Sequence, residues 1–362
     1  MTHALTPVEC SDAVCSWLQP AVDMGASDVH LVAGSPPMLR IQGELKPLNH
    51  PPLEADALRT HLLPLCSPGV VERFEQDLNV DFSMQTMLGD QLHRFRANYF
   101  VSGQALGACF RLIPEEIPTL DWANFPSDVA RRLAHFRNGL VIVSGVTGSG
   151  KSTTLAMLID MLNREGNHRI VTIEEPVEYV FPARENSIVT QREVGVDVHS
   201  FLDGLKYGLR QDPDVILVGE IRDQETARMA LSAAETGLLV LTTLHARDAK
   251  GVISRYADLY PPDAQEEIRA QLASSLRAVI CQHLLPSATG DKRELALEIM
   301  FNNTPIASGI RQGKLLSIDN NILTGRESGM VNLDESLRRL VSERRIHRDV
   351  ANRFASESSA QY

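Results

Sequence analysis

The sequence predicts an α/β protein of two domains, in which a small α+β domain precedes a larger domain built on a mainly parallel sheet. Two observations define this division: short extended patterns dominate residues 81–113, and apolar strand-like runs alternate with amphipathic segments beyond residue 118. Between them, residues 114–118 carry two prolines, which disfavour both helix and central strand. A chain of 362 residues is also long enough to bury two hydrophobic cores.

The first domain, residues 1–113, is expected to begin with a helix and to continue mainly as strands. Apolar residues recur at helical spacing through residues 8–24. Beyond this helix, short runs of extended character predict strands at 29–32, 38–41, 94–100 and 108–113. The segment 114–118 is the expected linker to the second domain.

The second domain, residues 119–362, contains apolar runs that predict buried strands at 140–143, 170–173, 215–218 and 238–243. Longer amphipathic segments separate these runs, and the alternation predicts a parallel sheet flanked by helices. From about residue 263 the pattern indicates helix. We expect that helix to begin at Pro262-Asp263 and to continue through Ile268, Leu272, Leu276 and Ile280.

Composition and charge narrow the class of protein. The net charge is -11, which argues against a surface that binds nucleic acid by neutralising phosphates, so no nucleic-acid partner is expected. Five scattered cysteines without a CxxC pair predict reduced, structural thiols. No apolar run reaches 18 residues, and the N-terminus has no signal-peptide pattern, which predicts a cytoplasmic protein.

A glycine-rich motif follows the first strand of the second domain. Residues 145–152 read GVTGSGKS, which matches the phosphate-binding pattern GxxxxGK[ST] between a strand and a helix. Glycines let the backbone N–H groups turn toward phosphate oxygens, and the helix N-terminus adds positive potential. Lys151 would reach the β- and γ-phosphates of ATP, and Ser152 would offer its hydroxyl to Mg²⁺. The expected nucleotide-binding residues are Gly145, Val146, Thr147, Gly148, Ser149, Gly150, Lys151, Ser152 and Thr153.

Acidic residues follow two further strands, at the sheet edge where α/β proteins bind ligands. Glu220 closes the strand 215–218, the position from which a Walker B acid acts on Mg²⁺ or on the attacking water. Glu174 and Glu175 follow the strand 170–173. Either of these two acids can polarise the water while the other orients the hydration shell of the metal.

A histidine, His245, follows the fourth strand. A single histidine in such a place is more often structural than catalytic. Its position beside three segments that handle phosphate favours a role in sensing the γ-phosphate.

Together these segments resemble the secretion ATPase superfamily. In that family the corresponding segments are called the Walker A motif, the Asp box, the Walker B motif and the His box. The resemblance runs from about residue 20 to about residue 350. It extends to segments typical of the pilus-retraction branch, among them GASDVHL at 25–31, GSPPMLRI at 34–41 and LRQDPD at 209–214. The sequence also has no tetracysteine zinc element, which favours the same branch.

The resemblance implies a RecA-like P-loop NTPase domain and a smaller, PAS-like N-terminal domain. It implies catalytic or magnesium roles for Glu174 and Glu220, and fingers that reach the nucleotide of a neighbouring subunit for Arg94, Arg96 and Arg111. Glu220 would contact Mg²⁺ directly or through water, and Glu175 is a further candidate for a magnesium contact. The family further implies a homohexamer that hydrolyses ATP, powers type IV pilus retraction and twitching motility, and acts on an inner-membrane platform protein from the cytoplasmic face.

Several positions depart from the pattern of the family. The usual Walker A proline is Val146, the Asp box aspartate is Glu175, and the first His box histidine is Leu238. The retraction motif near the C-terminus is replaced by PIASGIRQGK at 305–314. This divergence keeps open an accessory paralogue beside another retraction ATPase, or a motor of a related secretion or conjugation system. A regulatory subunit that binds nucleotide without hydrolysis is disfavoured by the three intact acids, and a DNA motor is disfavoured by the acidic charge.

Overall fold

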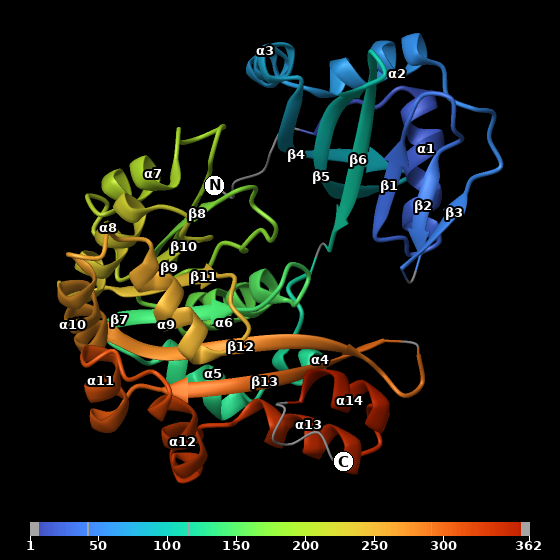
Figure 1. Ribbon diagram of the computed structural model, residues 1–362. Helices are drawn as coiled ribbons and strands as arrows, with labels where there is room; N and C mark the ends of the chain where they lie inside the picture. The colour runs from blue at the N-terminus through green and yellow to red at the C-terminus, as the bar shows by residue number, and fades with distance from the viewer. Residues whose placement is uncertain (1–6, 42, 115, 291, 356–362) are drawn as a thin grey trace. The chain divides into compact units, whose positions relative to one another are not determined.

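The computed structural model describes residues 7–41, 43–114, 116–290 and 292–355 (Figure 1). The chain divides into two compact units, residues 1–116 with 176–180 and residues 117–175 with 181–362. The first boundary lies between Glu116 and Ile117, inside the proline-containing segment. The sequence analysis did not predict that residues 176–180 belong to the N-terminal unit.

The N-terminal unit is built on a six-stranded sheet in the order β3-β2-β1-β6-β5-β4, and every neighbouring pair in it is antiparallel. Its strands are β1 (Asp28–Leu31), β2 (Met38–Ile41), β3 (Glu44–Pro47), β4 (Asn79–Leu88), β5 (Gln91–Ser102) and β6 (Ala105–Ile113). Its helices are α1 (Asp12–Asp23), α2 (Ala55–Leu62) and α3 (Pro68–Asp77), with the short 3₁₀ helix η1 (Leu63–Leu65). The rings of Phe95, Tyr99 and Phe110 are fully buried in its core. The predicted α+β domain is therefore confirmed.

The second unit is built on a seven-stranded sheet in the order β13-β12-β7-β11-β10-β8-β9. Its strands are β7 (Gly139–Ser144), β8 (His168–Glu174), β9 (Ser187–Glu193), β10 (Val215–Val218), β11 (Leu239–Leu244), β12 (Leu276–Pro286) and β13 (Arg293–Phe301). All neighbours pair in parallel except β12 and β13. Every residue of β7, β10 and β11 is buried, which explains why these strands are continuous apolar runs.

Helices connect and flank these strands. Those up to the end of the parallel strands are α4 (Leu120–Ala123), α5 (Ser127–Ala134), α6 (Lys151–Glu165), α7 (Phe201–Gly208), α8 (Gln224–Glu235) and α9 (Ala249–Asp258). Those of the C-terminal part are α10 (Gln265–Ser275), α11 (Thr304–Arg311), α12 (Ser317–Thr324), η2 (Arg326–Ser328), α13 (Leu333–Ser342) and α14 (Arg348–Phe354). The aspartates before α8 and α9 accept backbone N–H groups of the first turn and so fix where these helices begin.

The continuous helix expected beyond residue 263 is wrong. Helix α10 ends at Ser275, and both Leu276 and Ile280 lie in strand β12. This strand joins the sheet beside β7, and it forms an antiparallel hairpin with β13 (Figure 1). A strand buried between two neighbours is apolar on both faces, so periodicity alone does not separate it from a buried helix. The edge strand β9 was also missed, because its sequence SIVTQRE is largely polar.

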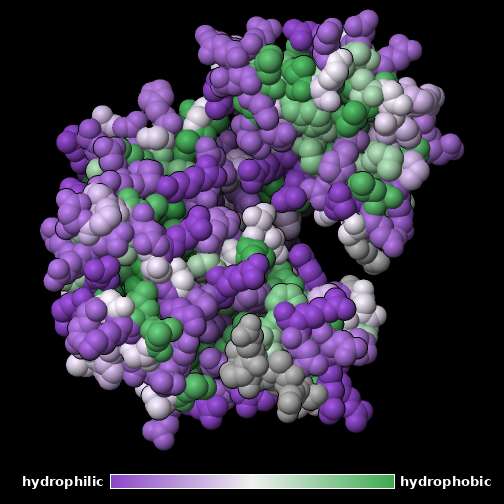
Figure 2. Space-filling model, viewed as in Figure 1, coloured by the Kyte–Doolittle hydropathy of each residue, from purple (hydrophilic) through white to green (hydrophobic). Residues whose placement is uncertain are grey.

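Hydrophobic side chains form small separate groups in a mostly hydrophilic surface in the view of Figure 2. The large apolar side chains most exposed among the described residues are those of Leu316 (83%) and Trp122 (72%), which lie far apart in the sequence. Within the described part of the chain, no helix combines the length and the apolar character needed to cross a lipid bilayer.

The packing of α7 on β8 leaves no room for a side chain at Gly204. A Cβ atom built there would lie 2.6 Å from the side chain of Ile173, which is itself fully buried. We expect Gly204→Ala to lower the free energy of unfolding by about 1–3 kcal/mol, because the helix must move away from the sheet. Urea denaturation measures the change. Ser232→Ala, at an exposed site on α8, is the control and should stay within about 0.5 kcal/mol of the wild type.

Candidate nucleotide-binding site

The glycine-rich loop connects β7 to α6, as the sequence predicted. Gly145, Gly148 and Gly150 have φ values of 147°, 77° and 88°, a region that residues with a Cβ atom rarely adopt. At Gly145 a Cβ atom would also lie 2.5 Å from the carbonyl oxygen of Gln282. Helix α6 begins at Lys151, so its first N–H groups face the loop. This backbone fits a polyphosphate, which a helix N-terminus and inward N–H groups bind.

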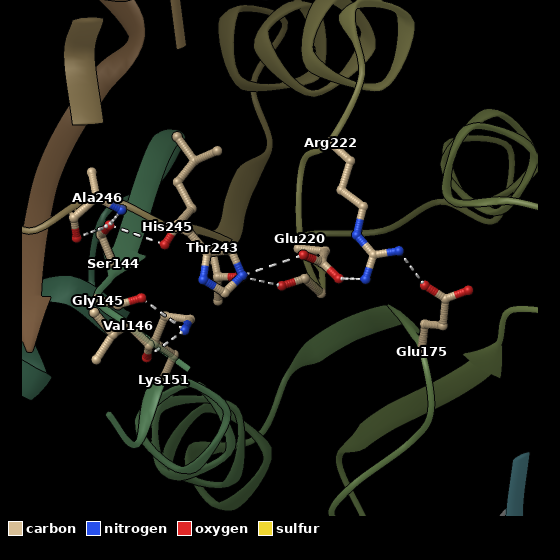
Figure 3. Close-up of polar contacts among 12 residues, drawn as sticks. Ser144, Gly145, Val146, Lys151, Glu175, Glu220, Arg222, Thr243, His245 and Ala246 are labelled. Atoms are coloured by element: carbon tan, nitrogen blue, oxygen red, sulfur yellow. Dashed lines mark hydrogen bonds and ion pairs between the residues drawn. The ribbon is translucent and has the colours of Figure 1, made fainter. Parts of the chain in front are cut away.

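Lys151 extends back over the loop. Its Nζ atom donates to the carbonyl oxygens of Gly145 at 3.0 Å and Val146 at 3.1 Å (Figure 3). The next residue, Ser152, is exposed in the first turn of α6. Among the described residues, no group of three or more His, Cys, Asp and Glu side chains forms a metal cage. The Ser152 hydroxyl and the Glu220 carboxylate are oxygen ligands of the kind that Mg²⁺ prefers, so these two residues would hold the ion.

The sheet order places the other candidate residues beside this loop. Strands β7, β11, β10 and β8 are consecutive neighbours, and their carboxyl ends lead to the phosphate loop, His245, Glu220 and Glu174 respectively. Thr243 Oγ1 donates to the carbonyl oxygen of Gly219 at 2.6 Å and so joins the ends of β11 and β10. These segments lie far apart in the sequence, and the parallel topology unites them at one edge of the sheet.

Glu220 lies between His245 and an arginine. His245 Nε2 is 3.5 Å from Glu220 Oε2, while Arg222 forms an ion pair with Glu220 Oε1 (Figure 3). Burial and the nearby Lys151 ammonium lower the pKa of His245 below its ordinary value, against the opposing effect of Glu220. The neutral imidazole is therefore favoured at neutral pH. A neutral ring can donate one hydrogen bond to a phosphate oxygen without adding a full charge.

Arg222 is a site residue that the sequence analysis missed. Its Nη1 atom donates to Glu175 Oε2 at 2.9 Å, so one guanidinium joins the acids that follow β8 and β10. Partial burial alone would lower the pKa of Arg222, but the two carboxylates outweigh it and the pKa is raised. The signal available in the sequence was an arginine two residues after the acid that follows β10.

Glu174 is held by different partners. Thr172 Oγ1 donates to Glu174 Oε1 at 2.7 Å, and Gln191 Nε2 donates to the same oxygen at 3.2 Å. Gln191 is 3% exposed and also accepts the backbone N–H of Phe181 at 3.1 Å. Two adjacent acids are thus oriented apart: Glu175 toward Arg222, and Glu174 toward the edge strand β9.

We expect Gln191→Leu to lower kcat for ATP hydrolysis roughly ten- to hundredfold, the effect of losing one hydrogen bond to a carboxylate that must keep its position. The KM for ATP should change little, because Gln191 orients Glu174, an acid expected to handle water rather than to bind ATP. Steady-state phosphate release over a range of ATP concentrations separates the two constants. Ile188→Ala, on the same strand with its side chain 63% exposed, is the control; an equal loss in both variants would contradict a specific role for Gln191.

The three arginines expected to act as fingers lie in the N-terminal unit. Arg94 Nη2 donates to the carbonyl oxygen of Val177 at 3.1 Å, and Arg96 Nε is 3.6 Å from Asp81 Oδ1. Arg111 Nε donates to Asp28 Oδ1 at 2.8 Å, and Asp28 is 5% exposed. All three side chains have partners within their own unit. Action on a neighbouring subunit remains a prediction for each.

A phosphate loop between a central strand and a helix, with acids after two further parallel strands of the same sheet, defines a P-loop nucleoside triphosphatase. A family model described as Type II/IV secretion system protein matches residues 10–355. The chain belongs to this family.

Relatives and a solved structure agree with the family. The chain is 41% identical to the type IV pilus retraction ATPase PilT of Pseudomonas aeruginosa, over 91% of this chain and 94% of that protein. It is 38% identical to a twitching motility protein of Neisseria gonorrhoeae, over 91% and 87%. A crystal structure of the pilus retraction motor PilT with bound ADP superposes with a TM-score of 0.84 at 40% identity, covering 95% of this chain and 97% of the other.

Proposed function

We propose that this chain is a motor ATPase that hydrolyses ATP to power the retraction of type IV pili and thereby twitching motility. The observation that carries the proposal is the row of Lys151, His245, Glu220 and Glu174 at one edge of the parallel sheet. Support for the pilus as the target comes from the names of the relatives, which match over nearly the whole length of both chains.

In the proposed mechanism the loop 145–150 binds the phosphates of ATP through its N–H groups, and Lys151 moves from its carbonyl contacts to the β- and γ-phosphates. Mg²⁺, when bound through Ser152 and Glu220, would supply positive charge to the phosphate oxygens. Glu220 or Glu174 orients and polarises the attacking water. His245 contacts the γ-phosphate and loses this contact when hydrolysis releases the phosphate. Its Nε2 atom lies 3.5 Å from Glu220 Oε2.

We propose that the working form is a homohexamer with ATP bound between subunits. Support comes from the membership of the chain in its family. An adjacent copy would supply further positive charge to the transition state through Arg94, Arg96 or Arg111, which would first leave their present partners Val177, Asp81 and Asp28. The ring would lie at the cytoplasmic face of the inner membrane and act on a platform protein of the pilus machine.

Deletion of the gene tests the retraction function. The host cells should keep or increase their surface pili, as seen by electron microscopy, and should lose twitching motility. A plasmid copy of the wild-type gene should restore motility, and a Lys151→Ala copy should not. Cells without pili would instead indicate a role in pilus assembly, and unchanged pili and motility would point to a secretion or conjugation system.

A second candidate is an accessory motor that works beside a paralogous retraction ATPase. It is favoured by one observation, the divergent segment 305–314, most of which forms helix α11. For an accessory motor, twitching in the deletion strain would fall only in part, or only under mechanical load. Overproduction of the wild-type chain would then fail to rescue a strain that lacks the paralogue.

A further inference from the structure

The loop that carries His245 is held by three strands of the same sheet. The backbone N–H of Ala246 donates to Ser144 Oγ on β7 at 2.9 Å (Figure 3). His283 Nε2 on β12 is 3.1 Å from the carbonyl oxygen of Arg247. The third contact comes from β13, where Glu298 Oε1 accepts the N–H of Ala249 at 2.7 Å. Two of the three strands that hold this loop, β12 and β13, thus belong to the hairpin.

Glu298 is an unusual residue for its place in the fold. It is 4% exposed and lies in a strand whose other residues beyond Arg293 are all buried. A buried carboxylate is costly unless specific partners stabilise its charge. The partner here is the first N–H of α9, at the positive end of that helix. Helix α9 begins four residues after His245, so the carboxylate fixes the point where the loop becomes a helix.

The ionisable groups around Glu298 come from three places. At the start of α9, the N-cap residue Asp248 and Lys250 lie on either side of Ala249. On α12, Asp319 Oδ2 accepts from Lys250 Nζ at 2.8 Å. On β12, the thiol of Cys281 is opposite Glu298 in the strand register. Burial raises the pKa of Glu298 to about 7, with Asp248 and Asp319 adding to the rise while the N–H of Ala249 and the ammonium of Lys250 oppose it.

We propose that Glu298 is a positioning residue for ATP hydrolysis, because its carboxylate holds the amino end of α9 and thereby the loop that directs His245 toward Glu220 and the phosphate loop. The inference rests on the role proposed for His245. It gives the hairpin of β12 and β13 a direct influence on the nucleotide site. It gives the same influence to helix α12, which is joined to α9 through Lys250. The ionised carboxylate binds the helix terminus more strongly than the protonated form does.

The test compares wild-type protein with Glu298→Gln across the pH range, using the full-length purified protein. Glutamine keeps an oxygen that can accept from Ala249 but never ionises. The ratio of wild-type kcat to variant kcat should rise from near unity at about pH 6 to about two- to fivefold at about pH 8, the effect of one charge at a helix terminus. Other titrating groups, His245 and His283 included, are present in both proteins and cancel in the ratio.

Substitutions at two residues near Glu298 should shift the pH midpoint of the rise in the kcat ratio in opposite directions. Asp319→Asn removes a negative charge and should move it to lower pH, and Lys250→Met removes a positive charge and should move it to higher pH. Both side chains are more than one third exposed, so neither change disturbs the core. If Glu298 had a purely structural role, the kcat ratio would not rise with pH, and neither variant would show a midpoint that could shift.

Two readouts do not depend on turnover. Amide hydrogen exchange in a peptide covering Ala249 should be faster in Glu298→Gln than in the wild type at about pH 8, after correction for intrinsic rates. The wild type should also lose stability as pH rises from about 4.5 to about 7, because the native carboxyl holds its proton more tightly than the unfolded one, and Glu298→Gln should lack this part of the dependence.

The outcomes separate this inference from the proposed function. A kcat ratio that stays constant with pH, or an unchanged exchange rate at Ala249, would overturn the role of Glu298. Undiminished turnover in His245→Ala would contradict the role proposed for the histidine. Loss of the retraction phenotype has no bearing on either result, because both measurements use purified protein.

Discussion

With Glu220→Gln, steady-state phosphate release should fall about 10²- to 10⁴-fold while ATP binding persists. Glutamine has the shape of glutamate but lacks the negative charge that polarises water or holds the hydration shell of Mg²⁺. It also loses the ion pair with Arg222 and weakens the contact with His245 that the structure places at this carboxylate. Phosphate release measures turnover, and the fluorescence of a labelled ATP analogue measures binding.

Two further variants make this experiment decisive. Glu225→Gln removes an exposed carboxylate in the first turn of α8 and should turn over like the wild type. Glu174→Gln distinguishes the two candidate bases: the larger loss of kcat identifies the acid that activates water. Wild-type turnover in Glu220→Gln would contradict the assignment of the nucleotide site, whatever Glu174 does.

Removal of a true arginine finger should lower kcat by about 10³- to 10⁵-fold, because the transition state of phosphoryl transfer loses a positive charge in a site shielded from water. The variants are Arg94→Ala, Arg96→Ala and Arg111→Ala. Arg59→Ala is a matched control in the same unit, since its ion pair with Glu75 is exposed on both sides. The control should change kcat by less than about twofold.

Mixed assemblies of the proposed homohexamer test whether the arginine acts across subunits. An inactive Glu220→Gln protein and an inactive finger variant are mixed after dissociation of the proposed hexamers. Some interfaces then combine an intact Glu220 from one chain with an intact arginine from the next, and turnover should return. Failure of every mixture to regain activity would refute action in trans. Loss of folding in Arg111→Ala, detected by circular dichroism, would instead indicate that its pair with the buried Asp28 is structural.

The positions of those parts of the site that depend on a local sequence pattern could be predicted from the sequence. The phosphate loop is a contiguous motif, and Glu220 and His245 each follow a buried strand, so parallel pairing alone unites them. The strand limits at 215–218 agree with β10 to the residue. The strand predictions agree with the structure because a fully buried parallel strand has few alternatives once turns or polar residues bound it, whereas the roles of Glu220 and His245 stay predictions.

The contacts that depend on the direction of a side chain could not be predicted from the sequence. Arg222 faces Glu175 only because β8 and β10 are neighbours, although β9 and α7 lie between them in the chain. Gln191 reaches Glu174 from an edge strand whose polar sequence resembles a loop. Glu298 was missed because the segment before it was interpreted as helix, and a strand that is apolar on both faces gives no period-2 signal.

The position of β12 has a consequence for the size of the smallest unit that can fold. Strand β7, which leads into the phosphate loop, is covered on one side by β11 and on the other by β12. A chain cut after α10 would expose the backbone of a fully buried strand along its whole length, and such an edge invites pairing with other chains. The segment after residue 275 is therefore an integral part of the nucleotide-binding sheet, and gene fragments that omit it should aggregate before they can bind ATP.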